Sequence, residues 1–138
     1  MEKKTKKNIK IRETNKSGKR IGDLYFPRGL KRIITSDTRH NFKSYDDILA
    51  KMRSIDVGPY KAEELDCDDR TKWVLANTIC DPNYAKLHGA PVGEARGRYK
   101  EDSAYHSLII FWVAPNKRYY YEPASKKIVN FHPREIII

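Results

Sequence analysis

The most constraining feature of this sequence is a run of six apolar residues, L-I-I-F-W-V, from Leu108 to Val113. Successive side chains of a strand point to opposite faces of a sheet, so a strand that is apolar at every position must be covered on both faces. The run is much shorter than the roughly 20 residues that cross a bilayer as a helix. It therefore predicts the central strand of a buried sheet and no membrane association.

Three further segments after residue 90 are typical of strands. Residues 90–99, 117–123 and 126–131 contain β-branched and aromatic residues and are separated by turn-forming sequences such as P-N-K. The central strand itself is expected within residues 104–113. The segment that begins at Ile21 is broken by Pro27 and Gly29, so it is expected to be extended and rich in loops.

Two amphipathic helices are expected before these strands. Ser44 followed by Asp47 is similar to a capping box, and apolar residues follow at helical spacing. The second helix should run from Asp66 or Cys67 to Ile79, with acidic residues in its first turn, where they suit the positive end of the helix dipole. Helices followed by an antiparallel sheet define an α+β fold.

The length and the charge distribution predict how the chain is divided. A chain of 138 residues fits one domain. Residues 1–20 contain nine Lys or Arg and two Glu, whereas the remaining residues contain 19 basic and 16 acidic side chains. We therefore expect a basic, disordered tail at residues 1–20 and a single domain at residues 21–138. Because no apolar segment follows the positive start, we expect a cytoplasmic protein rather than a secreted one.

The two cysteines, Cys67 and Cys80, are expected to be free thiols in a reducing compartment. A structural zinc site needs Cys or His ligands two to four residues apart, and the cysteines and histidines of this chain lack that spacing. The sequence therefore predicts no metal and no cofactor.

The sequence E-L-D-C-D-D-R places Cys67 in the first turn of the second helix, among three aspartates. Unpaired backbone N–H groups at that position favour negative charge on the sulfur, whereas the aspartates oppose it. A reactive Cys67 would need a cation, and His106, at the start of the central strand, is the candidate. Glu122, in Y-Y-Y-E-P on the following strand, could orient the imidazole ring.

These three motifs, D-C-D-D, H-S-L-I-I-F and Y-Y-Y-E-P, occur in an order that resembles the transglutaminase-like branch of the papain-like cysteine proteases, in particular its short bacterial and phage-type members. The resemblance covers about residues 60–125. It implies a papain-like, transglutaminase-like α+β core, in which a nucleophile helix packs on an antiparallel sheet. It also implies that Cys67 is the nucleophile, His106 the general base and Glu122 the orienting residue.

The function implied by this resemblance is cysteine-dependent amide acyl transfer or hydrolysis, as in a peptidase, an amidase or a transglutaminase, with a peptide or protein substrate. Tyr60 would replace the family's oxyanion donor, and Asp68 and Asp69 would support the helix start. Two alternatives stay open. The chain could be an inactive binding module of the same fold, or a nucleic-acid-associated protein that contacts polyanions through residues 1–20.

The predicted triad depends on the register of the hairpin that joins its histidine strand to its glutamate strand. A two-residue turn that pairs Ala114 with Lys117 would put the two side chains on opposite faces of the sheet. A register that pairs Trp112 with Arg118 would put them on the same face. A β-bulge after a tight turn would give the same-face arrangement as well.

Overall fold

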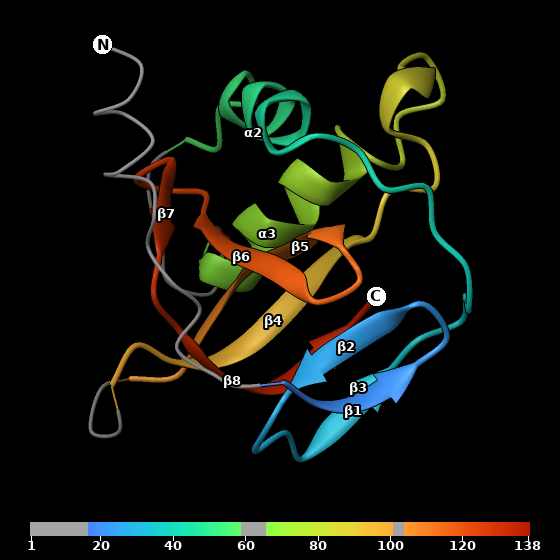
Figure 1. Cartoon of the computed structure of the whole chain (residues 1–138). Helices are drawn as coiled ribbons and strands as arrows, with labels where there is room; N and C mark the ends of the chain where they lie inside the picture. Colours follow the sequence, from blue (N-terminus) through green and yellow to red (C-terminus); the bar gives the residue numbers. More distant parts are fainter. Residues whose placement is uncertain (1–16, 59–65, 101–103) are drawn as a thin grey trace, which may run out of the picture.

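The computed structural model of the protein describes residues 17–58, 66–100 and 104–138 (Figure 1). Its strands are β1 (Ser17–Ile21), β2 (Leu24–Pro27), β3 (Arg32–Ile34), β4 (Val92–Arg98), β5 (His106–Ala114), β6 (Lys117–Glu122), β7 (Lys127–Val129) and β8 (His132–Ile137). Six of them form one sheet in the order β3-β8-β4-β5-β6-β7, and β1 and β2 form a separate hairpin. The strands contain 43 residues and the two α-helices 19, so sheet dominates the described part of the chain.

The helices are α2 (Tyr45–Arg53), α3 (Cys67–Ala76) and the short 3-10 helix η1 (Ala85–Leu87). The predicted first helix is confirmed, because Ser44 is the N-cap and its Oγ atom accepts a hydrogen bond from the N–H of Asp47 at 3.0 Å. The second helix begins at Cys67 as predicted, but it ends at the C-cap Asn77 and not at Ile79. The Asn77 side-chain amide and backbone N–H both donate to the carbonyl of Trp73 in the last turn.

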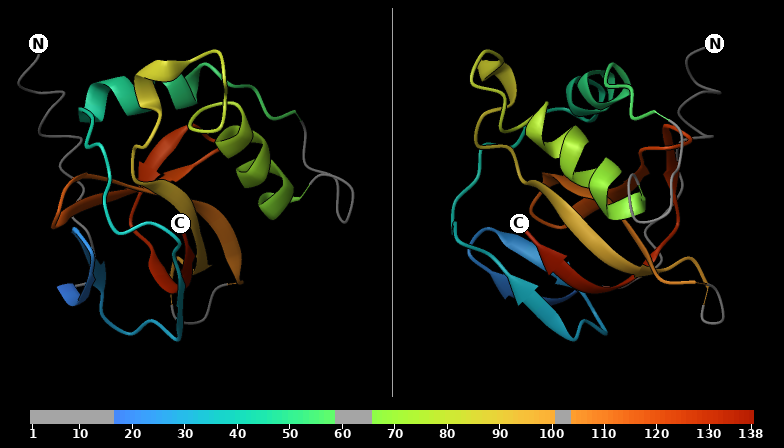
Figure 2. Two further views of the ribbon diagram at one scale, coloured as in Figure 1. Left: turned by 90° about the vertical axis from the view of Figure 1, so that its right-hand side faces the viewer. Right: turned by 180° about the vertical axis from the view of Figure 1, so that it is seen from behind.

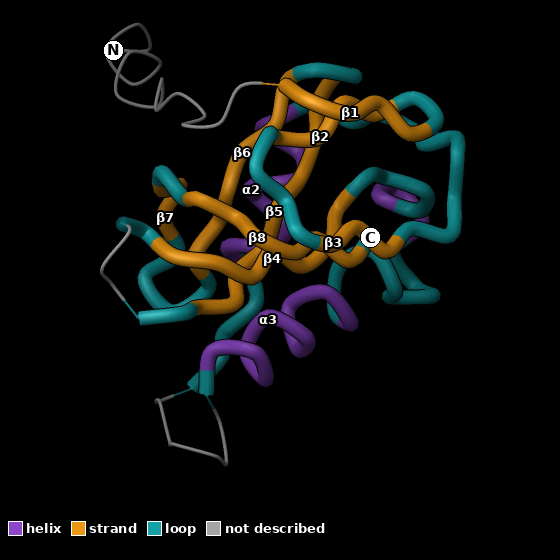
Figure 3. Tube along the Cα trace, turned by 90° about the horizontal axis from the view of Figure 1, so that it is seen from below, coloured by secondary structure: helices purple, strands orange, loops and turns teal. Residues whose placement is uncertain are grey.

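Both faces of the six-stranded sheet are covered, by α2 and α3 on one face and by the β1–β2 hairpin on the other (Figures 2 and 3). Residues of β5 alternate between the two cores. Ile109 and Phe111 pack on the helix side, while Leu108, Ile110 and Trp112 pack on the hairpin side, and all five have an exposed fraction of 0%. The predicted central strand, covered on both faces, is therefore confirmed.

The β1–β2 hairpin is fastened to the sheet by main-chain and aromatic contacts. The Tyr25 N–H donates to the carbonyl of Pro115 at 2.8 Å, and the Tyr25 carbonyl accepts from Trp112 Nε1 at 2.9 Å. Arg118, which is completely buried, donates to the same carbonyl at 3.3 Å. The ring of Phe26 packs edge-on against Trp112, with 5.2 Å between the centroids. The hairpin therefore belongs to the same packed unit as the sheet.

The predicted order of helices followed by an antiparallel sheet is wrong in two respects. Strands β1, β2 and β3 precede the helices, and β3 pairs with β8 in parallel, so the large sheet is mixed. Arg32 lies opposite Glu135, and Ile33 lies opposite Ile136. The segment expected to be rich in loops forms a strand here because a C-terminal strand, far away in the sequence, supplies its hydrogen-bond partners.

Part of the predicted basic tail belongs to the fold. Residues 17–20 lie in β1, whereas residues 1–16 lie outside the described residues. Among the helices of the described residues, none has the length and apolar character needed to cross a membrane.

Candidate functional site

Cys67 and His106 lie in one cleft, between the start of α3 and the start of β5. The Cys67 Sγ atom accepts a hydrogen bond from the backbone N–H of Ser107, with 3.4 Å between the two atoms. The cleft has a volume of about 200 Å³. We call it the thiol cleft, and its lining residues are Cys67, Asp68, Arg96, Tyr105, His106 and Ser107.

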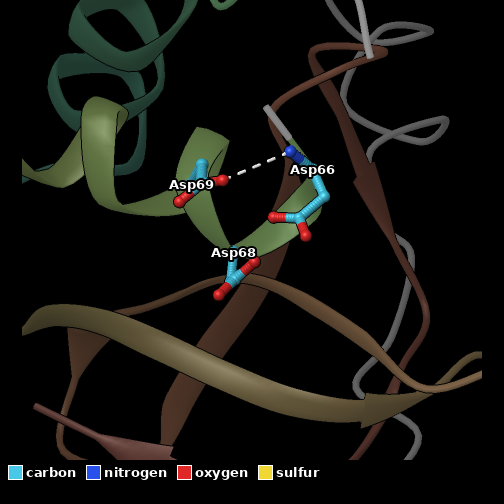
Figure 4. A group of neighbouring side chains, drawn as sticks. All are labelled: Asp66, Asp68 and Asp69. Carbon is cyan, nitrogen blue, oxygen red and sulfur yellow. Dashed lines mark hydrogen bonds between the residues drawn. The ribbon is translucent and has the colours of Figure 1, made fainter. Parts of the chain in front are cut away.

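The aspartates around Cys67 organise the start of α3 (Figure 4). Asp66 is the N-cap and forms a capping box with Asp69, in which the Asp66 N–H donates to the Asp69 carboxylate at 3.4 Å. Asp68 forms an ion pair with Lys72, one turn later, at 3.9 Å. Both of these side chains are exposed, so their ion pair contributes little stability. These contacts fix the helix start and with it the position of Cys67.

Among the described residues, these three aspartates lie close enough together for their carboxylates to hold a metal ion. One carboxylate oxygen of each of Asp66, Asp68 and Asp69 lies within 4.8 Å of the others. Oxygen atoms at this spacing suit a hard divalent cation. The capping box and the ion pair with Lys72 already use these carboxylates, so the arrangement is explained without a cation.

Glu94 holds two residues that line the thiol cleft. Its side chain is 7% exposed, and its carboxylate accepts hydrogen bonds from Arg96 Nε at 2.9 Å and from Ser107 Oγ at 2.6 Å. The hydrogen bond with Glu94 also raises the pKa of the Arg96 guanidinium above its usual value. A carboxylate this deeply buried needs such partners. The network therefore fixes two of the lining residues before any ligand binds.

Tyr99 packs beside His106. The centroid of its ring lies 5.0 Å from that of His106. Burial, and to a smaller extent the charges of Glu122 and Cys67, raises the pKa of Tyr99 well above its usual value. The phenol therefore stays protonated at neutral pH, within electrostatic reach of both residues.

The β5–β6 hairpin has the register that was predicted to put His106 and Glu122 on the same face of the sheet. Trp112 pairs with Arg118, and an irregularity separates this pair from the turn. Side chains alternate along each strand. If the same register is extended toward the start of β5, it therefore puts His106 and Glu122 on the same face of the sheet. The Glu122 carboxylate also accepts a hydrogen bond from the N–H of Ser125 at 3.1 Å, in the turn after β6.

The structure thus brings part of the predicted site together. Cys67, Asp68 and His106 line the thiol cleft. Glu122 ends β6, and its carboxylate accepts hydrogen bonds from the N–H groups of the following turn, whereas Asp69 belongs to the capping box. Tyr60 lies outside the described residues.

Several residues that line or support the thiol cleft were not predicted from the sequence. Glu94 and Arg96 are two residues apart on a strand, a spacing that puts both side chains on one face. That charged pair in an otherwise buried strand was a signal that could have been used. The positions of Tyr105 and Ser107 beside the thiol depend on how α3 packs on β5, and no local pattern indicates this packing.

Solved structures with a similar fold include a lectin. One is the PSL1a–E64 complex, with a TM-score of 0.64 and 17% identity over 80% of this chain and 43% of that chain. Another is the Polyporus squamosus lectin bound to the human-type influenza-binding epitope Neu5Aca2-6Galb1-4GlcNAc, with a TM-score of 0.60 and 14% identity over 77% of this chain and 42% of that chain. At these identities the likeness concerns the fold alone, and this chain spans less than half the length of either structure. No family model and no curated protein matches the chain.

These comparisons contradict the predicted membership of the transglutaminase-like branch of the papain-like cysteine proteases. Neither a family model nor a curated protein supports the predicted family, and one of the structures with a similar fold is a lectin. Two predictions depended on that resemblance and are therefore wrong. They are the papain-like α+β core with a nucleophile helix and the function of amide acyl transfer or hydrolysis. The predicted peptide or protein substrate is wrong for the same reason. The predicted polyanion partner of residues 1–20 is not supported by the similar structure, which is bound to a glycan. An acidic helix start, a strand histidine and a Glu-Pro pair are each common local patterns, so their order did not define a family.

Proposed function

We propose that this chain is a ligand-binding module and that its ligand enters the thiol cleft. The observation that carries the proposal is the set of side chains that converge there. Tyr105 is 46% exposed, and it lines the cleft together with Arg96, Ser107 and the start of β5 at His106. A concave site where a few polar groups converge from separate elements is the usual form of a small-ligand site.

A hydroxyl-rich ligand, such as the end of a glycan, suits this lining. The C–H face of a sugar ring can pack on an exposed aromatic side chain, and Tyr105 offers the ring face that is not covered by the guanidinium of Arg98, which lies 5.5 Å from the ring centroid. Sugar hydroxyls can pair with side chains that present several donors or acceptors, as Arg96 and Asp68 do. The glycan bound to the Polyporus squamosus lectin supports carbohydrate as the first class to test.

The size of the cleft limits how much of the ligand it holds. Small-molecule sites usually have volumes of about 300–1,000 Å³. The thiol cleft, at about 200 Å³, is smaller. We therefore expect it to hold one sugar residue, with the rest of a glycan outside. Because Glu94 already fixes Arg96 and Ser107, little ordering is needed on binding.

The two free cysteines provide a direct test of where the ligand binds. Cys67 lines the cleft, whereas Cys80 is exposed outside it. Alkylation of each thiol by iodoacetamide would be followed by mass spectrometry, with and without Neu5Aca2-6Galb1-4GlcNAc or Galb1-4GlcNAc. The Cys67→Ala and Cys80→Ala variants assign the two labels. A bound glycan should slow alkylation of Cys67 at least fivefold and leave the rate at Cys80 unchanged.

E64, the compound named with the PSL1a structure, is the second probe of the same cleft. Binding of E64 that requires Cys67, together with no protection by either glycan, would show that the thiol cleft is a ligand site but not for carbohydrate. Equal protection of both cysteines by a glycan would indicate a nonspecific effect. Unchanged alkylation of Cys67 with all three compounds would contradict the proposal as a whole.

A further inference from the structure

A second hollow lies beside the thiol cleft. It has a volume of about 560 Å³, and its lining comes from the end of β4, the segment after β4 and the start of β8. We call it the basic cavity, and its lining residues are Arg98, Lys100, His132 and Arg134. The thiol cleft is smaller than most small-ligand sites, whereas the basic cavity falls within their usual range of about 300–1,000 Å³.

The two hollows lie on one face of the sheet, the face on which the helices pack. Val92 of β4 belongs to the helix-side core, and side chains alternate along a strand, so Arg96 and Arg98 point to that face as well. Arg96 lines the thiol cleft, and Arg98, two residues or about 7 Å further along β4, lines the basic cavity. His132 lies directly opposite Arg98 on β8 and therefore shares its face.

Tyr105 and Arg98 join the thiol cleft to the basic cavity. Tyr105 lines the cleft, and the Arg98 Cζ atom lies 5.5 Å from the centroid of its ring. A guanidinium at this distance over an aromatic ring makes a favourable cation–π contact. A lining residue of the cleft thus touches a lining residue of the cavity, so the two hollows adjoin.

The pairing of β4 with β8 shapes the basic cavity before any ligand binds. The register shifts after Arg96, and Arg134 is the extra residue of the resulting bulge. A Cβ atom at Gly97 would lie 2.1 Å from the carbonyl oxygen of His132, a distance that real Cβ atoms do not show. The glycine therefore allows the close approach of the strands that places Arg134 and His132 in the lining.

We propose that the thiol cleft and the basic cavity form one extended site for an oligosaccharide, with an end residue in the cleft and the following residues in the cavity. This inference rests on the proposed function, because it requires a sugar in the cleft. The cavity has almost three times the volume of the cleft, so on the same scale it holds about two or three further residues. The ligand is therefore a chain of about three or four sugar residues.

The lining of the basic cavity suits sugar hydroxyls without requiring a charged ligand. A guanidinium has five N–H donors, so Arg98 and Arg134 can each keep a partner in the protein and still donate to a hydroxyl. The imidazole ring of His132 adds a donor or an acceptor. The formal net charge of +10 attracts any anion, so neutral glycans are the appropriate probes.

The dependence of binding on glycan length tests the extended site. The probes are galactose, Galb1-4GlcNAc and the neutral tetrasaccharide that contains two Galb1-4GlcNAc units. The measured quantity is the glycan concentration that halves the rate of Cys67 alkylation by iodoacetamide in the full chain. The tetrasaccharide should act at a concentration about tenfold lower than galactose, because two additional hydrogen bonds in the cavity supply about that factor.

A substitution in the basic cavity locates the additional sugar residues. Arg134 lines the cavity and not the cleft, so Arg134→Gln should weaken protection by the tetrasaccharide about fivefold and leave galactose unchanged within about twofold. The matched control is Arg39→Gln, which removes the same charge at an exposed position outside both linings and should leave all three probes unchanged. Circular dichroism spectra would show that both variants are folded, and the length series in the unmodified protein needs neither variant.

The possible results separate the extended site from the proposed function. Equal protection of Cys67 by galactose and by the tetrasaccharide would overturn the extended site and leave the proposed function standing. Tighter binding of the tetrasaccharide that Arg134→Gln does not weaken would place the additional residues outside the basic cavity and would also overturn the inference. No protection by any of the three glycans at millimolar concentration would overturn carbohydrate as the ligand of the cleft, and the extended site with it.

Discussion

Replacing Phe26 with alanine would test whether the β1–β2 hairpin is part of the cooperative fold. Phe26 is 1% exposed, and its ring centroid lies 5.2 Å from that of Trp112. Truncating a buried phenylalanine costs about 3–5 kcal/mol in the free energy of unfolding, because contacts are lost and a cavity remains. Phe26→Leu retains most of the volume but loses the aromatic pair, so we expect a loss of about 1 kcal/mol.

Urea unfolding of each variant, followed by circular dichroism and tryptophan fluorescence, measures these losses. Natural domains are stable by about 5–15 kcal/mol, so the alanine variant should unfold at a much lower urea concentration. Ile34→Ala is the control, because this side chain is 45% exposed and its loss should change the stability by about 0.5 kcal/mol or less. An alanine variant of Phe26 as stable as the control would refute the reasoning. A separate transition at low urea, seen by fluorescence alone, would show that the hairpin detaches first.

Three other substitutions have defined outcomes in the same unfolding assay. Gly97→Ala should destabilise the fold by about 1–3 kcal/mol, since the new Cβ would lie 2.1 Å from the His132 carbonyl, and an unchanged stability would contradict the β4–β8 register. Ser44→Ala should cost about 1 kcal/mol through loss of the α2 cap, and a neutral result would refute that role. Burial acts to raise the pKa of Asp23, but hydrogen bonds and charge from His40 hold it below its usual 3.8. Ionised Asp23 therefore stabilises the fold above about pH 4 and loses this contribution as the pH falls through the lowered pKa. The stability difference between the unmodified protein and Asp23→Asn should shrink on acidification, and a constant difference would contradict the ion pair.

The candidate site was predicted from the sequence only in part. Cys67 at a helix start and His106 at the start of the central strand could be placed from capping and apolar patterns, and the structure puts both in the thiol cleft. Glu94 was not predicted, because a buried carboxylate becomes acceptable only when Arg96 and Ser107 arrive as partners. The family was predicted wrongly, since short motifs report local structure and not the whole arrangement of strands.

The sequence by itself determined the elements whose causes lie within a few residues. Ser44 caps α2 through an adjacent N–H, and the uninterrupted apolar run in β5 required cover on both faces. Only the tertiary structure decided which strands pair and what covers them. The parallel β3–β8 pair, the β1–β2 hairpin that buries Arg118 and the four basic residues of the basic cavity all join segments far apart in the chain. Such contacts form only after long loops have closed, so their energies leave no periodic pattern in the local sequence.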